Sequence, residues 1–126
     1  MAGIPYIAVV DDDQRVRHSL ATLLRSLGLT AATYDSAASF LATDISAADG
    51  VLTDLQMPDM SGIDLLAAVK ARDRSIPVVI MTAFPEDVLR RRAMALGAAG
   101  FFDKPVDVDA LIACFRLVID GFDAGC

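Results

Sequence analysis

Polar side chains occur at the ends of four hydrophobic runs in this chain. They are Asp11 and Asp12, Asp54, Thr82 and Lys104. If each run is a buried parallel strand, the carboxyl ends of these strands meet at one edge of the sheet, where open α/β sheets hold their ligands. Three carboxylates, a hydroxyl and an ammonium group would then share one crevice. That combination predicts a site for a divalent cation and a phosphoryl group.

The three carboxylates are the part of this site that would bind a metal ion. Hard cations such as Mg²⁺ take oxygen ligands, and Asp11, Asp12 and Asp54 supply them. Without a cation the three negative charges repel one another, so at least one carboxyl pKa should rise. Asp54 could then act only as a ligand, or it could attack phosphorus as a nucleophile. Both roles stay open on the residues alone.

Donors to a phosphoryl group follow the last two runs. Thr82 offers a hydroxyl, Lys104 a compact positive charge, and the backbone amide of Ala83 a further N–H at the entry to a helix. Each feature alone would be ordinary, because an aspartate after a strand is usually a helix cap or a turn former. Asp12 or Asp13 is expected to cap the first helix in this way. The joint occurrence after four strands is what indicates a site.

The elements that position these residues alternate strand and helix five times. Apolar residues at helical spacing mark the helices, and short apolar runs mark strands that are buried on both sides. This alternation predicts a doubly wound α/β fold, with a five-stranded parallel sheet, helices on both faces and right-handed crossovers. The strands are expected near residues 6–10, 31–34 and 51–53, from Pro77 onward, and at residues 100–103.

Capping residues predict where the helices begin and end. The expected boundary residues are Gly28 after the first helix, Ser36 before the second, Ser61 with Asp64 as a capping box before the third, Pro85 at the first position of the fourth, Gly97 near its end, and Asp107 before the last. The buried face of the last helix is expected to carry Val108, Leu111, Ile112, Phe115, Ile119 and Phe122.

The bulk composition fits one domain, residues 1–126. The chain is 55% hydrophobic and has a formal net charge of −6 without a basic stripe, which disfavours direct nucleic-acid binding. No apolar run reaches membrane-spanning length, and the start lacks the basic region of a signal peptide, so a cytoplasmic protein is expected. Cys114 is expected to pack as a small apolar group, Cys126 to fray, and His18 to be a solvated helix residue.

Four motifs, in this order and at these intervals, resemble those of response-regulator receiver domains of two-component signalling. The match extends over nearly the whole chain. Residues 34–37, with Phe40 and Leu41, are similar to the FixJ-type subfamily. The four motifs are Val9-Val10-Asp11-Asp12-Asp13, Thr53-Asp54-Leu55-Gln56-Met57-Pro58 with Ser61-Gly62, Met81-Thr82-Ala83, and Phe102-Asp103-Lys104-Pro105.

The resemblance implies a fold and a metal site. The fold would be flavodoxin-like, (βα)5, with strand order 2-1-3-4-5. Asp54 would be the phospho-acceptor. Asp11, Asp12, Asp54 and the backbone carbonyl of Gln56 would hold Mg²⁺ or Mn²⁺.

The same resemblance implies how the phosphoryl group is bound and sensed. Thr82, Ala83 and Lys104 would bind it, and the peptide bond from Lys104 to Pro105 would be cis. Thr82 would move toward the phosphoryl group, and Phe101, the switch aromatic, would rotate into the space that Thr82 leaves. The face built from the fourth helix, the fifth strand and the fifth helix would then change shape, as a shift between states that pre-exist.

Partners also follow from the resemblance. The phosphoryl donor would be a sensor histidine kinase or a phosphotransfer protein, and the domain itself would be no enzyme beyond slow self-dephosphorylation. A homodimer that depends on phosphorylation is a further expectation. The output would come from a stand-alone regulator or from a DNA-binding domain of a longer transcription factor. The expected kinase contacts are Gln14, Arg15 and His18. The residues expected on the output face are Val88, Leu89, Arg91 and Arg92. The run from Arg90 to Arg92 is otherwise expected to be solvated.

Phe84 departs from the family pattern, because it is large and apolar where many relatives carry a polar residue. With Gln56 it would flank the path of a hydrolytic water. We expect Phe84 to lengthen the lifetime of the acyl phosphate by hindering that water; the alternative is that it packs before Pro85.

Two other classes of protein use similar residues. A phosphohydrolase of the haloacid dehalogenase type would use Asp11 and Asp13, but Arg15 stands where such enzymes carry a hydroxyl or valine, and no cap domain is evident. A flavodoxin-like or pseudo-receiver module would bind without phosphorylation. Three aspartates would repel a flavin phosphate, and no acidic or lysine position of the receiver pattern is missing.

Overall fold

Five parallel strands form a single sheet in the order β2-β1-β3-β4-β5. The structure, a computed structural model, describes residues 4–119. The parallel sheet in this strand order confirms the predicted fold class and strand order. The strands are β1 (Tyr6–Val10), β2 (Thr30–Tyr34), β3 (Gly50–Asp54), β4 (Val78–Thr82) and β5 (Gly100–Asp103); the helices are α1 (Gln14–Ser26), α2 (Ala37–Leu41), the 3-10 turn η1 (Ile45–Ala47), α3 (Gly62–Arg72), α4 (Asp87–Ala95) and α5 (Val108–Val118).

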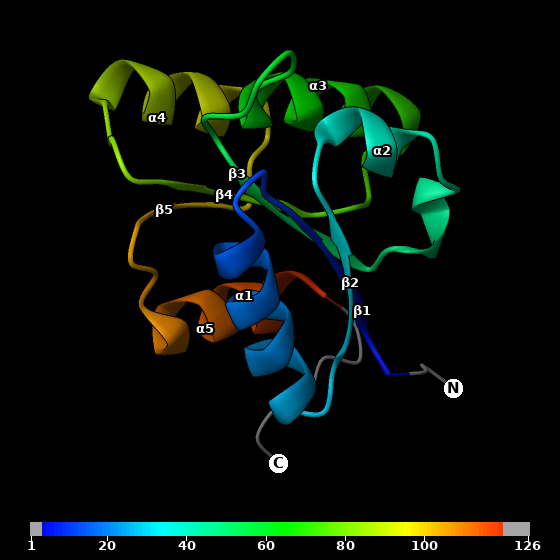
Figure 1. Cartoon of the computed structure of the whole chain (residues 1–126). Helices are drawn as coiled ribbons and strands as arrows, with labels where there is room; N and C mark the ends of the chain where they lie inside the picture. The colour runs from blue at the N-terminus through cyan, green and yellow to red at the C-terminus, as the bar shows by residue number, and fades with distance from the viewer. Residues whose placement is uncertain (1–3, 120–126) are drawn as a thin grey trace.

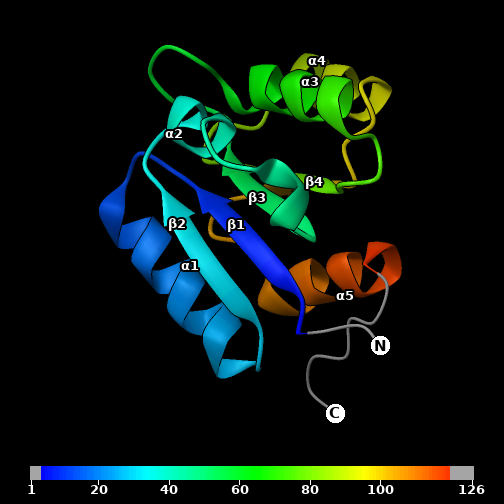
Figure 2. The same ribbon diagram turned by 90° about the vertical axis from the view of Figure 1, so that its right-hand side faces the viewer.

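The helices cover both faces of the sheet (Figure 1). α2, α3 and α4 lie on one face, and α1 and α5 on the other; α1 runs along β2 and β1 (Figure 2). Successive strand residues point to opposite faces, so one core holds Ala8, Val51 and Ile80, and the other holds Val9 and Leu52. This explains why the central strands are apolar without alternation.

The register of the parallel strands brings the predicted site residues to one edge. Val10 pairs with Thr53, and Asp54 pairs with Met81. Thr82 in turn lies opposite Asp103, the residue before Lys104. The carboxyl ends of β1, β3, β4 and β5 therefore lie side by side, and the loops that follow them meet at this edge of the sheet.

Side-chain caps start most helices at the predicted residues. The carboxylate of Asp13 accepts from the backbone N–H of Arg15 at 2.9 Å and so caps α1. Ser36 and Asp107 cap α2 and α5, and Ser61 forms a reciprocal capping box with Asp64. Gly28 and Gly97 follow α1 and α4 with positive φ angles of 86° and 98°, a conformation that glycine adopts without steric cost.

The predicted start of α4 is wrong. Pro85 is not in the first helical turn, because α4 begins at Asp87 with Glu86 as its N-cap. The hydroxyl of Thr82 accepts from the backbone N–H of Phe84 at 3.0 Å, which turns the chain directly after β4. Glu86 is still extended (φ −133°, ψ 135°).

Two smaller expectations also need correction. β4 starts at Val78, one residue after Pro77. On α5, Leu111, Ile112 and Phe115 are buried and Ile119 follows as its buried C-cap, but Val108 is 37% exposed because it borders a surface groove described below. Phe122 and Cys126 lie outside the described residues.

Gly62 brings the start of α3 close to the end of β3. Its N–H donates to the carbonyl of Leu55 at 2.9 Å. A Cβ atom here would press on the backbone carbonyl of Asp54 and lie 3.0 Å from the Cα of Leu55. Only glycine allows this approach, which sets the course of the loop that follows Asp54.

Among the helices of residues 4–119, none has the length and apolar character required to span a membrane.

Candidate functional site

Three carboxylates converge at the edge of the sheet where β1 and β3 end. Asp11, Asp12 and Asp54 each place one oxygen within 4.8 Å of the others. Asp11 is fully buried and Asp54 is 5% exposed, whereas Asp12 is exposed. Hard oxygen ligands, one of them open to solvent, suit Mg²⁺, which keeps several of its waters when it binds proteins. The donor set therefore fits the predicted cation.

Lys104 connects two of the carboxylates. Its Nζ lies 3.0 Å from Oδ2 of Asp11 and 3.0 Å from Oδ1 of Asp54. The side chain is only 19% exposed, so these contacts are weakly screened by solvent. An ammonium group has three N–H donors, and two of them serve the aspartates. One donor remains for an incoming oxyanion.

The pKa values of this cluster are shifted by burial and by its charges. Burial raises the pKa of Asp54, the hydrogen bond from Lys104 opposes that rise, and the neighbouring charge of Asp11 adds to it; the net direction is upward. For Lys104, burial lowers the pKa of the amine, but its hydrogen bonds to Asp54 and Asp11 outweigh burial and raise it. Lys104 is thus held in its charged form, while Asp54 ionises less readily than an ordinary aspartate.

The backbone around Asp11 is held by contacts that the sequence did not predict. Its carbonyl accepts from the guanidinium of Arg17 at 2.7 Å, and its carboxylate accepts from the backbone N–H of Asp13 at 2.8 Å. Arg17 is six residues away on α1, and no local pattern signals such a contact. These bonds fix the buried carboxylate against Lys104.

Thr82 lies at the same edge, but its hydroxyl serves another residue. Thr82 is fully buried. Its Oγ1 donates to the side-chain carbonyl of Gln56 at 2.8 Å and accepts from the N–H of Phe84. The sequence predicted that Gln56 offers its backbone carbonyl to the metal ion and flanks the path of a hydrolytic water, but it did not predict this hydrogen bond between the side chains of Thr82 and Gln56. Ala83 is exposed in the loop that follows.

Phe101 is already buried in this structure. It is 6% exposed and belongs to the same core cluster as Ala93 and Ala98. The guanidinium carbon of Arg90 lies 4.9 Å from the ring centroid, and Arg90 also donates to the carbonyl of Phe101 at 3.3 Å and pairs with Asp103 at 3.7 Å. The run from Arg90 to Arg92 was expected to be solvated, but Arg90 contacts Phe101 and Asp103. The ring of Phe101 thus already has the buried position in this structure.

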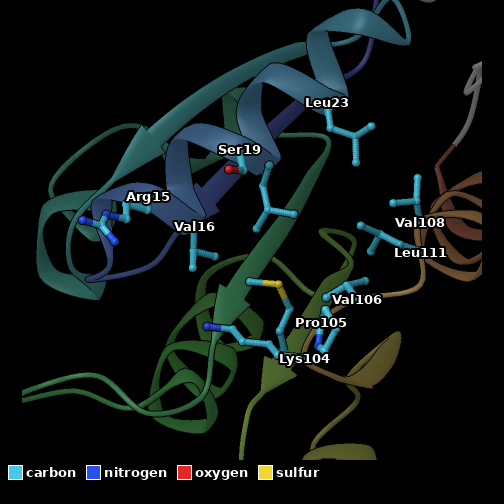
Figure 3. A pocket seen from close by; sticks show the side chains of 11 residues that line it. Arg15, Val16, Ser19, Leu23, Lys104, Pro105, Val106, Val108 and Leu111 are labelled. Carbon is cyan, nitrogen blue, oxygen red and sulfur yellow. The ribbon is translucent and has the colours of Figure 1, made fainter.

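A groove of about 480 Å³ opens beside Lys104, between α1 and the connection from β5 to α5 (Figure 3). Its walls are mainly apolar, and Arg15 and Lys104 are its charged residues. The Lys104–Pro105 peptide bond at its edge is cis, as the resemblance implied. Of the three expected kinase contacts, only Arg15 lines this groove; Gln14 and His18 line a separate polar hollow with Arg17 and Arg25.

Other predicted residues lie outside the cluster. Asp13 uses its carboxylate to cap α1, which leaves it poorly placed for the second acidic role that a haloacid dehalogenase mechanism requires. Phe84 is 70% exposed, so the alternative that it is a packing residue is wrong. Cys114 is partly buried, its thiol donates to the carbonyl of Ala99 at 3.4 Å, and burial raises the pKa of that thiol.

Asp54→Asn is expected to stabilise the Mg²⁺-free protein at neutral pH. Because folding raises the pKa of Asp54 above its ordinary value of 3.8, its contribution to stability is full below that value and is lost as the pH rises through the higher folded-state pKa. The amide avoids this loss. Urea unfolding should therefore give the variant the larger free energy of unfolding at pH 7, and the difference should shrink toward pH 4.

Asp59→Asn is the matched control, since Asp59 is exposed in the loop after β3 and asparagine tolerates its positive φ angle of 68°. It should show no comparable gain. Equal stabilities of wild type and Asp54→Asn at pH 7 would contradict the raised pKa of Asp54 in the folded protein.

Comparison with known proteins agrees with this geometry. The family model for the response regulator receiver domain matches residues 7–116. The transcriptional regulatory protein FixJ of Azorhizobium caulinodans is 43% identical over 111 residues, which are 87% of this chain and 53% of that protein. The DNA-binding transcriptional regulator NtrC of Escherichia coli K12 is 36% identical over 90% of this chain and 24% of its own length.

Solved structures show the same relationship. A crystal structure titled FixJ-N has a TM-score of 0.84 and 32% identity, and the match covers 98% of this chain and 99% of that one. A BeF3-activated DrrB receiver domain has a TM-score of 0.83 and 26% identity over 92% of this chain and 97% of its own. This chain spans about half the length of the FixJ protein it matches. It belongs to the response regulator receiver domains of two-component signalling.

Proposed function

We propose that Asp54 accepts a phosphoryl group from a phosphohistidine on a sensor histidine kinase or phosphotransfer protein. The observation that carries the proposal is the position of Lys104, 3.0 Å from both Asp54 and Asp11, at the edge of a three-carboxylate cluster. A phosphoryl group needs positive charge on its oxygens during transfer. The cluster provides a nucleophile and a cation within bonding distance of each other.

In the transfer step, a carboxylate oxygen of Asp54 forms a bond to phosphorus as the bond from phosphorus to the histidine nitrogen breaks. The electron pair of that bond stays on the imidazole. The free N–H of Lys104 donates to a transferring oxygen. Thr82, and the amide of Ala83, are proposed as further donors once the acyl phosphate has formed. Hydrolysis of this acyl phosphate would be slow and would be the only turnover.

Mg²⁺ or Mn²⁺ is proposed to sit among Asp11, Asp12 and Asp54, with the backbone carbonyl of Gln56 as a further ligand. Three carboxylates and one ammonium leave two negative charges, which one divalent cation would balance. The ion would supply positive charge next to the oxygens of the phosphoryl group.

The groove beside Lys104 supports a docking site for the phosphoryl donor. It runs along α1 to the cis peptide bond before Pro105 (Figure 3), so a helix laid in it would end near Asp54. Arg15 belongs to this groove; Gln14 and His18, which are exposed on α1, would touch the donor only outside it.

The output is proposed to pass through the face made by α4, β5 and α5. Arg90 and Phe101 join α4 to β5 there, and exposed Val88 and Leu117 lie on α4 and α5. A phosphorylation-dependent homodimer or an effector would use this face, with Leu89, Arg91 and Arg92 as neighbours of Val88 on α4.

The whole protein's role is inferred from its relatives. FixJ and NtrC are named as transcriptional regulators and are longer than this chain. We infer that residues 1–126 act as one receiver domain that controls an output partner or a DNA-binding domain, without touching nucleic acid itself. The expected cytoplasmic location stays a prediction.

Acetyl phosphate with Mg²⁺ is expected to add one phosphoryl group to the protein, because a small donor needs no docking groove. Intact-mass spectrometry should show this gain in wild type. Asp54→Ala should show none, and chelation of the metal should suppress it.

The neighbouring control Asp59→Asn should be phosphorylated like wild type. A gain that persists in Asp54→Ala, or turnover of a phosphomonoester that is lost in Asp11→Asn but kept in Asp54→Asn, would contradict the proposal and favour a phosphohydrolase.

Phe84 is proposed to slow the hydrolysis of the acyl phosphate. Its ring is 70% exposed, two residues after Thr82, where it has no packing role to explain its size. Phe84→Asn and Phe84→Glu should lose the phosphoryl mass several-fold faster than wild type after the donor is removed. Unchanged rates in both variants would refute this role.

A further inference from the structure

The hydroxyl of Thr82 has one proton and, in the proposed mechanism, two acceptors that compete for it. In this structure the proton goes to the side-chain carbonyl of Gln56, with an oxygen–oxygen distance of 2.8 Å. The same hydroxyl accepts from the N–H of Phe84 at 3.0 Å. A hydroxyl donates only once, so it cannot serve Gln56 and a phosphoryl oxygen at the same time.

The donor Thr82 and the acceptor Gln56 differ in how water can reach them. Gln56 is exposed, so its carbonyl can bind water when Thr82 leaves it. Thr82 is fully buried, so its hydroxyl has no such substitute. Loss of the Gln56 acceptor would leave a buried donor unsatisfied, which is more unfavourable than loss of one ordinary hydrogen bond.

The other half of the switch is already in place. Phe101 is buried, Arg90 lies over its ring, and Arg90 also holds its carbonyl. Burial of the ring therefore requires no further change on this chain. What remains is the redirection of the Thr82 O–H from the side-chain carbonyl of Gln56 to a phosphoryl oxygen.

We infer that the side chain of Gln56 is a positioning residue that holds the Thr82 hydroxyl away from the phosphoryl group and so weakens the phosphorylated state. This inference rests on the proposed function, since it requires a phosphoryl group on Asp54. It is distinct from an effect of Gln56 on hydrolysis, because it concerns an equilibrium between two acceptors. Removing the Gln56 acceptor should favour the phosphoryl-bound arrangement.

The test is the affinity of the full chain for beryllium fluoride in the presence of Mg²⁺. This phosphoryl analogue binds reversibly, so hydrolysis cannot affect the result. Gln56→Met keeps the length of the side chain and removes its acceptor. We expect it to bind at least about fivefold more tightly than wild type, which is the lower bound expected when a buried donor loses its partner in the free state. Isothermal titration calorimetry measures this, as does fluorine NMR.

Variants of Thr82 provide the matched controls. In a Thr82→Val background, which has no hydroxyl, Gln56→Met should leave the affinity unchanged. In a Thr82→Ser background, which keeps the hydroxyl, the gain should persist. A gain in the valine background would show that Gln56 acts through the metal ligands or the local charge, and would overturn the inference.

A second readout needs neither metal nor analogue. The carbon and proton shifts of the Thr82 methyl group in the free protein should differ between wild type and Gln56→Met, because the hydroxyl loses its acceptor. If wild type binds beryllium fluoride and Gln56→Met binds it with equal or lower affinity, the inference about Gln56 is overturned and the proposed function is not. Wild type that fails to bind it at all would overturn the proposed function, and the inference with it.

Discussion

The contact of the Lys104 ammonium with Asp11 and Asp54 is the interaction on which the rest of the site depends. Buried carboxylates this close cannot both ionise without a nearby cation. The hydrogen bond from Lys104 offsets part of this effect, but burial and the neighbouring charge of Asp11 still raise the pKa of Asp54. The remaining negative charge would attract a divalent cation to the cluster. Because Lys104 is partly exposed, a phosphoryl group could reach its ammonium group. The three carboxylates and the single ammonium group therefore leave the site with a net negative charge.

The sheet carries this arrangement because parallel strands bring four chain segments to one level. Two further contacts link it to the surface. Gln56 reaches Thr82 from the loop after β3, and Arg90 reaches Phe101 from α4. In the first contact, the hydroxyl of Thr82 donates its hydrogen bond to Gln56. In the second, Arg90 holds α4 against β5. Under the proposed function, these two contacts are the ones through which a phosphoryl group on Asp54 would act on the face made by α4, β5 and α5.

The sequence sufficed for the fold and for the placement of Asp11, Asp12, Asp54, Thr82 and Lys104 at one edge of the sheet, because strand ends and helix caps are local patterns that the parallel topology converts into proximity. It did not predict the roles of the Gln56 side chain, Arg17 or Arg90, since each depends on which partner a long side chain meets across the fold. The start of α4 was misplaced for a related reason. Pro85 favours a helix start locally, but the hydroxyl of Thr82 holds the N–H of Phe84 and keeps the following loop extended.

The most direct test of the central claim is to locate the phosphoryl group after reaction with acetyl phosphate and Mg²⁺. Borohydride reduces an acyl phosphate of aspartate to homoserine, and peptide mass spectrometry then identifies the altered position. The account predicts homoserine at position 54 alone. Homoserine at position 11 or 12, or phosphate found only on a hydroxyl or imidazole side chain, would contradict it.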